Sequence, residues 1–222
     1  MRFLLLAFVV LAACGPRPDA TEADTPTPVM GTVTAVDRAP MAADGDALVT
    51  VETEAGETVE VRIPARMALC EADLGSFGTL RAGDRVEVVG ATEADGAIRP
   101  CTEPTHRLAR PGYTTGTFEG AYVAGFETSG FRPCGQPDAD WWVRTTEDMN
   151  LRYRNVMQNR EMVPGRGLGA FVRVTVEGEL SPEGAYGSLG GWDREVIVHR
   201  VIGEMEFLAP GDSEWPTPEC SE

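Results

Sequence analysis

Short runs of alternating apolar and polar residues, separated by turn residues, constrain the fold of this chain most strongly. In residues 58–63 (TVEVRI), Val59, Val61 and Ile63 fall on one face, and residues 171–177 (FVRVTVE) alternate in the same way. Alternation with a period of two is typical of a β-strand with one buried face. The 25 glycines and 16 prolines supply the turns that many short strands need. The sequence therefore predicts an all-β protein with little helix.

The first predicted module, residues 29–110, has three strands, a short helical connection and two further strands. The strands are expected at 29–38, 47–54, 58–63, 85–90 and 97–100, with the connection at 66–74. This order is that of a small Greek-key barrel of the OB type. The phrases Gly31-Thr32-Val33, 57–63 and 80–90 (LRAGDRVEVVG) resemble bacterial OB-fold modules of exported proteins. The resemblance implies a fold and says nothing about function.

The second predicted module, residues 111–209, is also expected to be an OB-like Greek-key barrel. Strands are expected at 116–126, 141–144, 171–177 and 194–202, with a short helix at 147–157. Phe131-Arg132-Pro133-Cys134 before a Trp-containing strand, followed by 174–179 (VTVEGE), resembles the C-terminal barrel of the NlpE-type envelope stress lipoproteins. The Cys-x-x-Cys signature of that family is absent, so the resemblance does not imply copper handling.

The N-terminal end predicts a lipid anchor. Arg2 precedes the ten-residue apolar run 3–12 (FLLLAFVVLA), which is too short to cross a bilayer and has the length of a signal-peptide core. Small residues then lead to Cys14, as in a bacterial lipobox, in which the thiol is acylated and the cysteine becomes the N-terminus. The alternative is an ordinary secretory peptide with an incidental cysteine. We expect a signal peptide at 1–13, a flexible tether at 14–28 (its proline-rich part 15–28 lacks large apolar side chains) and a polar tail at 210–222. Gly15 after the cysteine favours the outer membrane, facing the periplasm, by resemblance to enterobacterial sorting.

Four further cysteines predict disulfide bonds. They are Cys70, Cys101, Cys134 and Cys220. An exported chain with an even number of cysteines usually oxidises them in pairs, and four cysteines allow three connectivities. We expect sequence neighbours to pair, so that each bond stays within one module. Zinc-ligand spacing is absent, and we expect neither metal nor cofactor.

Charge and motifs indicate a binding protein without a catalytic centre. The formal net charge of −16 disfavours nucleic acid as a partner. The adjacent Trp141 and Trp142 must point to opposite faces of a strand, so one of them, with Tyr186 or Trp192, is a speculative ligand-binding group. Core packing is the alternative role for all four aromatic residues. His199, in the middle of a strand, is interpreted as structural. We therefore expect a non-enzymatic, lipid-anchored envelope protein that binds or senses an envelope protein or glycan. The alternative is a structural or assembly lipoprotein that acts as a spacer.

Overall fold

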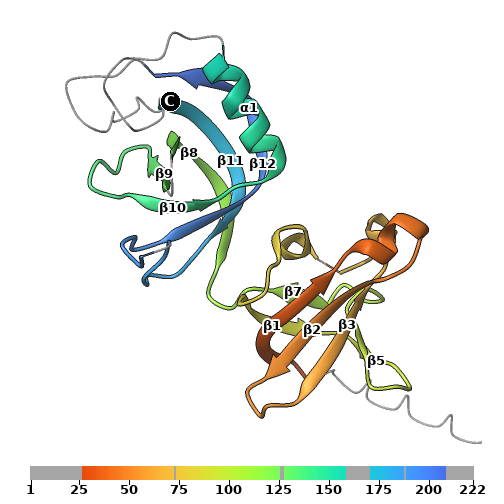
Figure 1. Cartoon of the computed structure of the whole chain (residues 1–222). Helices are drawn as coiled ribbons and strands as arrows, with labels where there is room; N and C mark the ends of the chain where they lie inside the picture. Colours follow the sequence, from red (N-terminus) through yellow and green to blue (C-terminus); the bar gives the residue numbers. More distant parts are fainter. Residues whose placement is uncertain (1–26, 73, 126–127, 159–170, 188, 209–222) are drawn as a thin grey trace, which may run out of the picture.

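The computed structural model consists of two β-sheets joined by a short linker. It describes residues 27–72, 74–125, 128–158, 171–187 and 189–208. The first sheet runs from Val29 to Ala109 and the second from Thr114 to Phe207. Figure 1 shows them as two curled sheets, coloured orange to yellow-green and green to blue. The prediction of an all-β fold with two tandem barrel-like modules is confirmed. Cys14, Cys220, the signal peptide, most of the tether and the tail from 210 lie outside the described residues.

The first sheet has seven strands and three short 3₁₀ helices. They are β1 (Val29–Asp37), η1 (Ala39–Ala43), β2 (Ala47–Thr53), β3 (Thr58–Ile63), η2 (Met67–Leu69), η3 (Gly75–Thr79), β4 (Arg85–Val89), β5 (Ala91–Thr92), β6 (Ile98–Arg99) and β7 (Arg107–Ala109). The strand order is β5-β6-β3-β2-β1-β4-β7, with β6 parallel to β3 and the other pairs antiparallel. Only Gly90 separates β4 from β5, although these strands lie near opposite ends of that order, so the sheet curls round.

This arrangement is an OB-type barrel whose fifth strand is interrupted. The segment 100–106 separates β6 from β7, and it carries Cys101, which is bonded to Cys70 after η2. The sequence predicted one strand at 97–100 and one helical connection at 66–74. The structure instead divides the last strand in two and uses two 3₁₀ helices. Both differences arise in a stretch where a disulfide, rather than side-chain alternation, sets the path of the chain.

The second sheet is a closed five-stranded barrel with one α-helix. Its elements are β8 (Thr114–Gly125), β9 (Thr128–Pro133), β10 (Trp141–Arg144), α1 (Glu147–Gln158), β11 (Val172–Leu180) and β12 (Glu195–Phe207). The strand order around the barrel is β10-β12-β11-β8-β9. β10 and β12 are parallel and the other neighbours are antiparallel. These pairings, with the helix between the third and fourth strands, are those of a complete OB barrel.

Helix α1 packs against the barrel through one face. The Thr146 hydroxyl accepts a hydrogen bond from the Met149 amide (3.2 Å), and Glu147 and Asp148 occupy the first turn, where the helix dipole favours negative charge. Met149 and Tyr153, four residues apart, are buried in the barrel core. Tyr153 packs edge-on against Tyr122 (ring centroids 5.2 Å apart). The predicted helix at 147–157 is therefore found, and it fills the barrel interior from one side.

Each barrel has its own apolar core. The first is built mainly from the inward-facing residues of β1 to β4, with Phe77 and Leu80 from the η3 region. The second contains the valines of β11 and β12 together with Tyr122, Phe131 and Trp141. Burial of about 25 cal/mol per Å² of apolar surface makes these two clusters the main source of stability. The predicted inward set at 172, 174 and 176 is fully buried.

Candidate functional site

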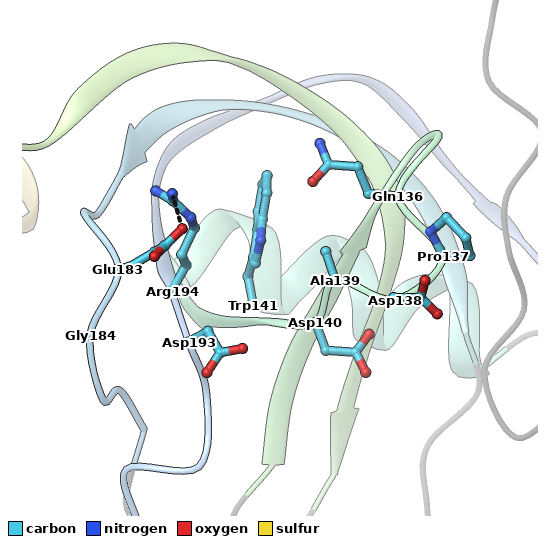
Figure 2. A pocket seen from close by; sticks show the side chains of 10 residues that line it. All are labelled: Gln136, Pro137, Asp138, Ala139, Asp140, Trp141, Glu183, Gly184, Asp193 and Arg194. Atoms are coloured by element: carbon cyan, nitrogen blue, oxygen red, sulfur yellow. Dashed lines mark hydrogen bonds and ion pairs between the residues drawn. The ribbon is translucent and has the colours of Figure 1, made fainter.

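A cavity of about 760 Å³ opens at one end of the second barrel (Figure 2). It lies between the β9–β10 loop and the β11–β12 connection. Its lining residues are Gln136, Pro137, Asp138, Ala139, Asp140, Trp141, Glu183, Gly184, Asp193 and Arg194. Two chain segments about fifty residues apart in sequence thus form one polar cavity with a single aromatic side chain in its wall.

The Trp141 indole is a rigid part of this wall. Its side chain faces the barrel interior and the residue is 6% exposed. It stacks on Phe131 (ring centroids 5.8 Å apart, planes at 21°) and meets Phe118 edge-on at 5.7 Å. In Figure 2 the indole stands between Gln136 and the Glu183–Arg194 pair. Aromatic packing of this kind holds the ring in one orientation.

Carboxylates dominate the polar part of the lining. Arg132 donates two hydrogen bonds to Asp140, at 2.8 and 2.9 Å, which fixes that side chain in a bidentate pair. Arg194 donates to Glu183 (3.1 Å) and to the Ser181 carbonyl (2.8 Å). Asp138 and Asp193 add two more acidic groups to the wall. The cavity therefore offers several oxygen acceptors, one guanidinium and one amide beside an aromatic ring.

Three of the four aromatic residues singled out from the sequence come together outside the cavity lining, on the other face of β10. Trp142 and Trp192 lie with ring centroids 5.9 Å apart, and Tyr186 forms a β-bridge with Trp192. All three side chains are partly exposed. Gly187 is required here: its φ is +78°, and a Cβ would lie 2.7 Å from the Trp192 ring. Trp141 does not join this group, because it points to the opposite face of β10, as predicted for adjacent strand residues.

A second polar centre joins the two barrels. Arg110, in the linker, is 1% exposed and forms ion pairs of 2.8 Å with Asp84 of the first barrel and Glu179 of the second. Arg144 on β10 reaches Asp84 at 2.6 Å, and Glu195 accepts a hydrogen bond from the Tyr113 hydroxyl (2.9 Å). We call these five charged residues, Asp84, Arg110, Arg144, Glu179 and Glu195, the junction cluster. Each of their side chains is at most 10% exposed.

Glu179 is the most strongly perturbed acid of the junction cluster. Burial by itself would raise the pKa of this carboxyl. Contacts with His199, Ser76 and Arg110 outweigh the burial and lower the pKa to about 2. The hydroxyl of Ser76, from η3, donates to Glu179 Oε1 (2.5 Å), and His199 Nε2 lies 3.2 Å from the same oxygen. Burial and the neighbouring Glu195 carboxylate raise the pKa of Tyr113. The cluster therefore holds Glu179 ionised and Tyr113 protonated.

Ser76, Glu179 and His199 do not have the arrangement of a hydrolytic triad. In a triad the serine hydroxyl faces an imidazole, which the acid orients from its far side. Here the Ser76 hydroxyl donates to the carboxylate itself, and the histidine approaches that same oxygen. A carboxylate with so low a pKa is a weak base. The geometry fits a structural contact, which agrees with the interpretation of His199 made from the sequence.

The structure describes three of the five cysteines, Cys70, Cys101 and Cys134. Cys70 and Cys101 form a disulfide with an S–S distance of 2.09 Å, which confirms that predicted pair. Cys134 follows β9, and its amide donates to the Glu119 carbonyl (2.8 Å). Its predicted partner Cys220 lies outside the described residues, as does the lipidation residue Cys14. The remaining disulfide and the acylation stay predictions.

The described part of the chain contains neither a metal-binding cluster nor a membrane-spanning helix. There, no group of three or more His, Cys, Asp and Glu side chains is arranged to hold a metal ion. Among the same residues, no helix combines the length and apolar character needed to cross a bilayer.

The chain matches no protein-family model, and no curated protein matches it in sequence.

The aromatic residues could be identified from the sequence, whereas neither polar centre could. The cavity depends on two loops that meet only in the folded barrel. The junction cluster depends on side chains that strand alternation places on the outer face. Val172, Val174 and Val176 of β11 point inward, so alternation places Glu179 on the outward face, where the sequence predicts that it is exposed. Only docking of the other barrel buries it.

Proposed function

We propose that this chain is a lipid-anchored cell-envelope protein that binds a glycan through its second barrel and does not catalyse a reaction. The anchor is Cys14, by which the protein would be held at the outer membrane, facing the periplasm. The observation that carries the proposal is the polar cavity with Trp141 in its wall, together with the partly exposed cluster of Trp142, Tyr186 and Trp192 on the other face of β10.

The chemistry of the cavity suits hydroxyl-rich ligands. Carboxylate and amide oxygens accept hydrogen bonds from hydroxyl groups, and the guanidinium of Arg194 donates to hydroxyl oxygens. Partly exposed aromatic rings provide apolar faces against which the C–H face of a sugar can pack. The cavity borders the loop between the fourth and fifth barrel strands, a region through which OB modules bind oligosaccharides.

Charge narrows the class of glycan. The cavity lining contains Asp138, Asp140, Glu183 and Asp193 against one cation, Arg194, and Arg132 pairs with Asp140 from outside the lining, so acidic groups exceed basic groups by two (four minus two). The whole chain carries a formal net charge of −16. Like charges repel at this range, so phosphorylated or carboxylated sugars are disfavoured. Neutral sugars and amino sugars are the expected ligands.

Isothermal titration with neutral, amino and anionic oligosaccharides tests this proposal. Neutral or amino sugars should bind, and Asp193→Asn should weaken binding about tenfold, the effect of losing one charge-assisted hydrogen bond. The control Glu57→Gln changes an exposed acid in the β2–β3 turn of the other barrel and should leave affinity unchanged. If no sugar binds and envelope crosslinking instead recovers one defined protein, the ligand class is wrong and a protein partner replaces it.

The absence of catalysis needs a separate measurement. Bound oligosaccharides should be recovered intact after prolonged incubation with the purified protein. Turnover that a single polar substitution in the cavity abolishes would contradict the non-enzymatic part of the proposal.

A spacer in an envelope complex is the second candidate function, and the junction cluster favours it. Arg110 forms buried ion pairs with both barrels. Such contacts hold the barrels in one arrangement, as a spacer of defined length requires. Deletion of the tether residues 15–28 separates the two candidates. If the protein is a binding module, the deletion variant keeps its affinity for the oligosaccharide in solution. If the protein is a spacer, the deletion variant loses its function in the cell, because the folded part no longer extends far enough from the membrane.

A further inference from the structure

A second cavity, of about 280 Å³, lies between the two barrels and is lined by basic rather than acidic side chains. The first barrel contributes Arg38, Thr79 and Arg81 to its wall, and the second contributes Arg144 and the start of α1. Glu147 is the one acidic residue among the described residues of the lining. This composition is the reverse of that of the polar cavity in the second barrel, where acidic groups predominate.

Arg38 and Arg81 have positive charges that no carboxylate balances within the described part of the chain. Most of the other described arginines form ion pairs with Asp or Glu. Arg38 instead donates to the carbonyls of Phe77 (2.8 Å) and Leu80 (3.0 Å), and its guanidinium lies 5.0 Å from the centre of the Phe77 ring. These contacts hold the side chain in place without supplying a negative charge. Desolvation accordingly lowers the pKa of Arg38.

Arg144 adds a buried hydrogen-bond donor to the same wall. Its charge is balanced by Asp84 (2.6 Å) and Glu195 (3.6 Å), and its Nη2 donates to the carbonyl of Thr79 (2.9 Å). The side chain is 10% exposed, yet its buried Nε has no hydrogen-bond partner among the residues that the structure describes. Buried donors are nearly always paired in folded proteins, so this N–H has the capacity to bind an acceptor that enters here.

The start of α1 supplies further donors. Thr145 and Thr146 line the cavity directly before the helix. The first amides of a helix have no acceptor within the helix, and the helix dipole places partial positive charge at this end. The Thr146 hydroxyl accepts a hydrogen bond from the Met149 amide and can still donate its own hydrogen. The helix end therefore strengthens a site that the arginines already define.

We propose that this cavity binds the phosphate group of a small soluble phosphorylated molecule, held by Arg38, Arg81 and the first residues of α1. The rigid N–H fork of arginine matches the oxygens of a phosphate, and helix N-termini bind the same group. The two unbalanced arginines against Glu147 leave an excess of one positive charge (two minus one), in a chain whose formal net charge is −16.

The size of the cavity selects a phosphate ester over the bare ion. At roughly 30 Å³ for each water molecule, the cavity has room for about nine waters, which is more than one phosphate needs. The remaining space suits a small organic group. This site is separate from the polar cavity of the second barrel, and either can bind its ligand without the other.

Isothermal titration of the full-length protein with glycerol phosphate tests the site. The unchanged chain should bind it, and Arg81→Gln should weaken binding about tenfold, because it removes a charge-assisted contact. Arg81 is exposed, so this variant should fold normally. Glu147→Gln removes the one acid known in the lining and should tighten binding about threefold. Inorganic phosphate should displace the ester; a ligand that phosphate cannot displace is not held by its phosphate group, and the proposal is then wrong.

Arg66→Gln is the matched control. Arg66 is also exposed, forms no ion pair among the described residues and lies outside the cavity lining, so its substitution should leave affinity unchanged. Absence of binding to the unchanged chain, or equal losses for Arg66→Gln and Arg81→Gln, would overturn the proposal.

A lipid headgroup is the other source of a phosphate, and a second titration separates the two. The experiment is repeated in neutral-detergent micelles that contain phosphatidylglycerol. This lipid would have to leave the micelle to enter a cavity lined by both barrels, so the affinity for glycerol phosphate should stay the same. Competition by the lipid that disappears in Arg81→Gln would show that the cavity receives a headgroup and that a soluble ligand is the wrong assignment.

Discussion

Replacing Arg110 by Met is the sharpest test of the junction cluster. Met has a similar length but no charge, so the change removes both 2.8 Å ion pairs and leaves the Asp84 and Glu179 carboxylates buried with fewer partners. Breaking a buried ion pair by removing one partner typically costs about 3–5 kcal/mol. For a chain of this size that corresponds to a fall in Tm of roughly 10 °C.

Arg107→Met is the matched control for this experiment. Arg107 lies three residues away, pairs with Glu87 and has a side chain that is 45% exposed. An exposed pair of this kind contributes about 0–1 kcal/mol. Urea unfolding followed by tryptophan fluorescence and far-ultraviolet circular dichroism measures both variants. Trp141, Trp142 and Trp192 lie in the second barrel and no tryptophan precedes them in the sequence, so fluorescence reports on the second barrel and the dichroism reports on both. We expect Arg110→Met to lower the midpoint strongly and to separate the two signals. Equal midpoints for the two variants would refute the reasoning that the junction cluster stabilises the docked barrels.

Three further predictions concern pH, the disulfide and the anchor. The Glu179 pKa is lowered from its ordinary 4.5 to about 2 in the folded chain, so its contribution to stability is complete above pH 5 and is lost as pH falls from about 4.5 to 2. Acid titration of Glu179→Gln should show a shallower loss over that window than the unchanged chain, and parallel curves would contradict this. Substituting both Cys70 and Cys101 by Ser should cost about 2–4 kcal/mol in urea unfolding, because it opens a loop of 31 residues; no loss would show that the bond does not stabilise the first barrel. Cys14→Ser should abolish incorporation of labelled palmitate and release the protein from membranes on fractionation, whereas retention of label would exclude the lipobox assignment.

The strands with clean alternation were predicted well from the sequence. Residues 58–63 form β3 with the expected bounds, and Trp141–Arg144 forms β10. Period-two patterns are local, so one strand contains enough information to identify itself. β9 was missed because Gly130 and Pro133 interrupt its pattern, although its partners on β8 and β10 still hold it in the barrel.

The features of the candidate site likewise fall into those that the sequence determined and those that only the tertiary structure determined. The sequence by itself determined alternating strands, turn glycines, an acidic net charge, four cysteines besides Cys14, and two adjacent tryptophans that must face opposite ways. Only the tertiary structure decided which aromatic residues meet, where the cavity opens, and that Arg110, Asp84 and Glu179 are buried together. The physical reason is the distance along the chain over which each effect acts. Alternation acts between adjacent residues, whereas burial of a charged outward-facing side chain depends on a surface that arrives from the other half of the chain.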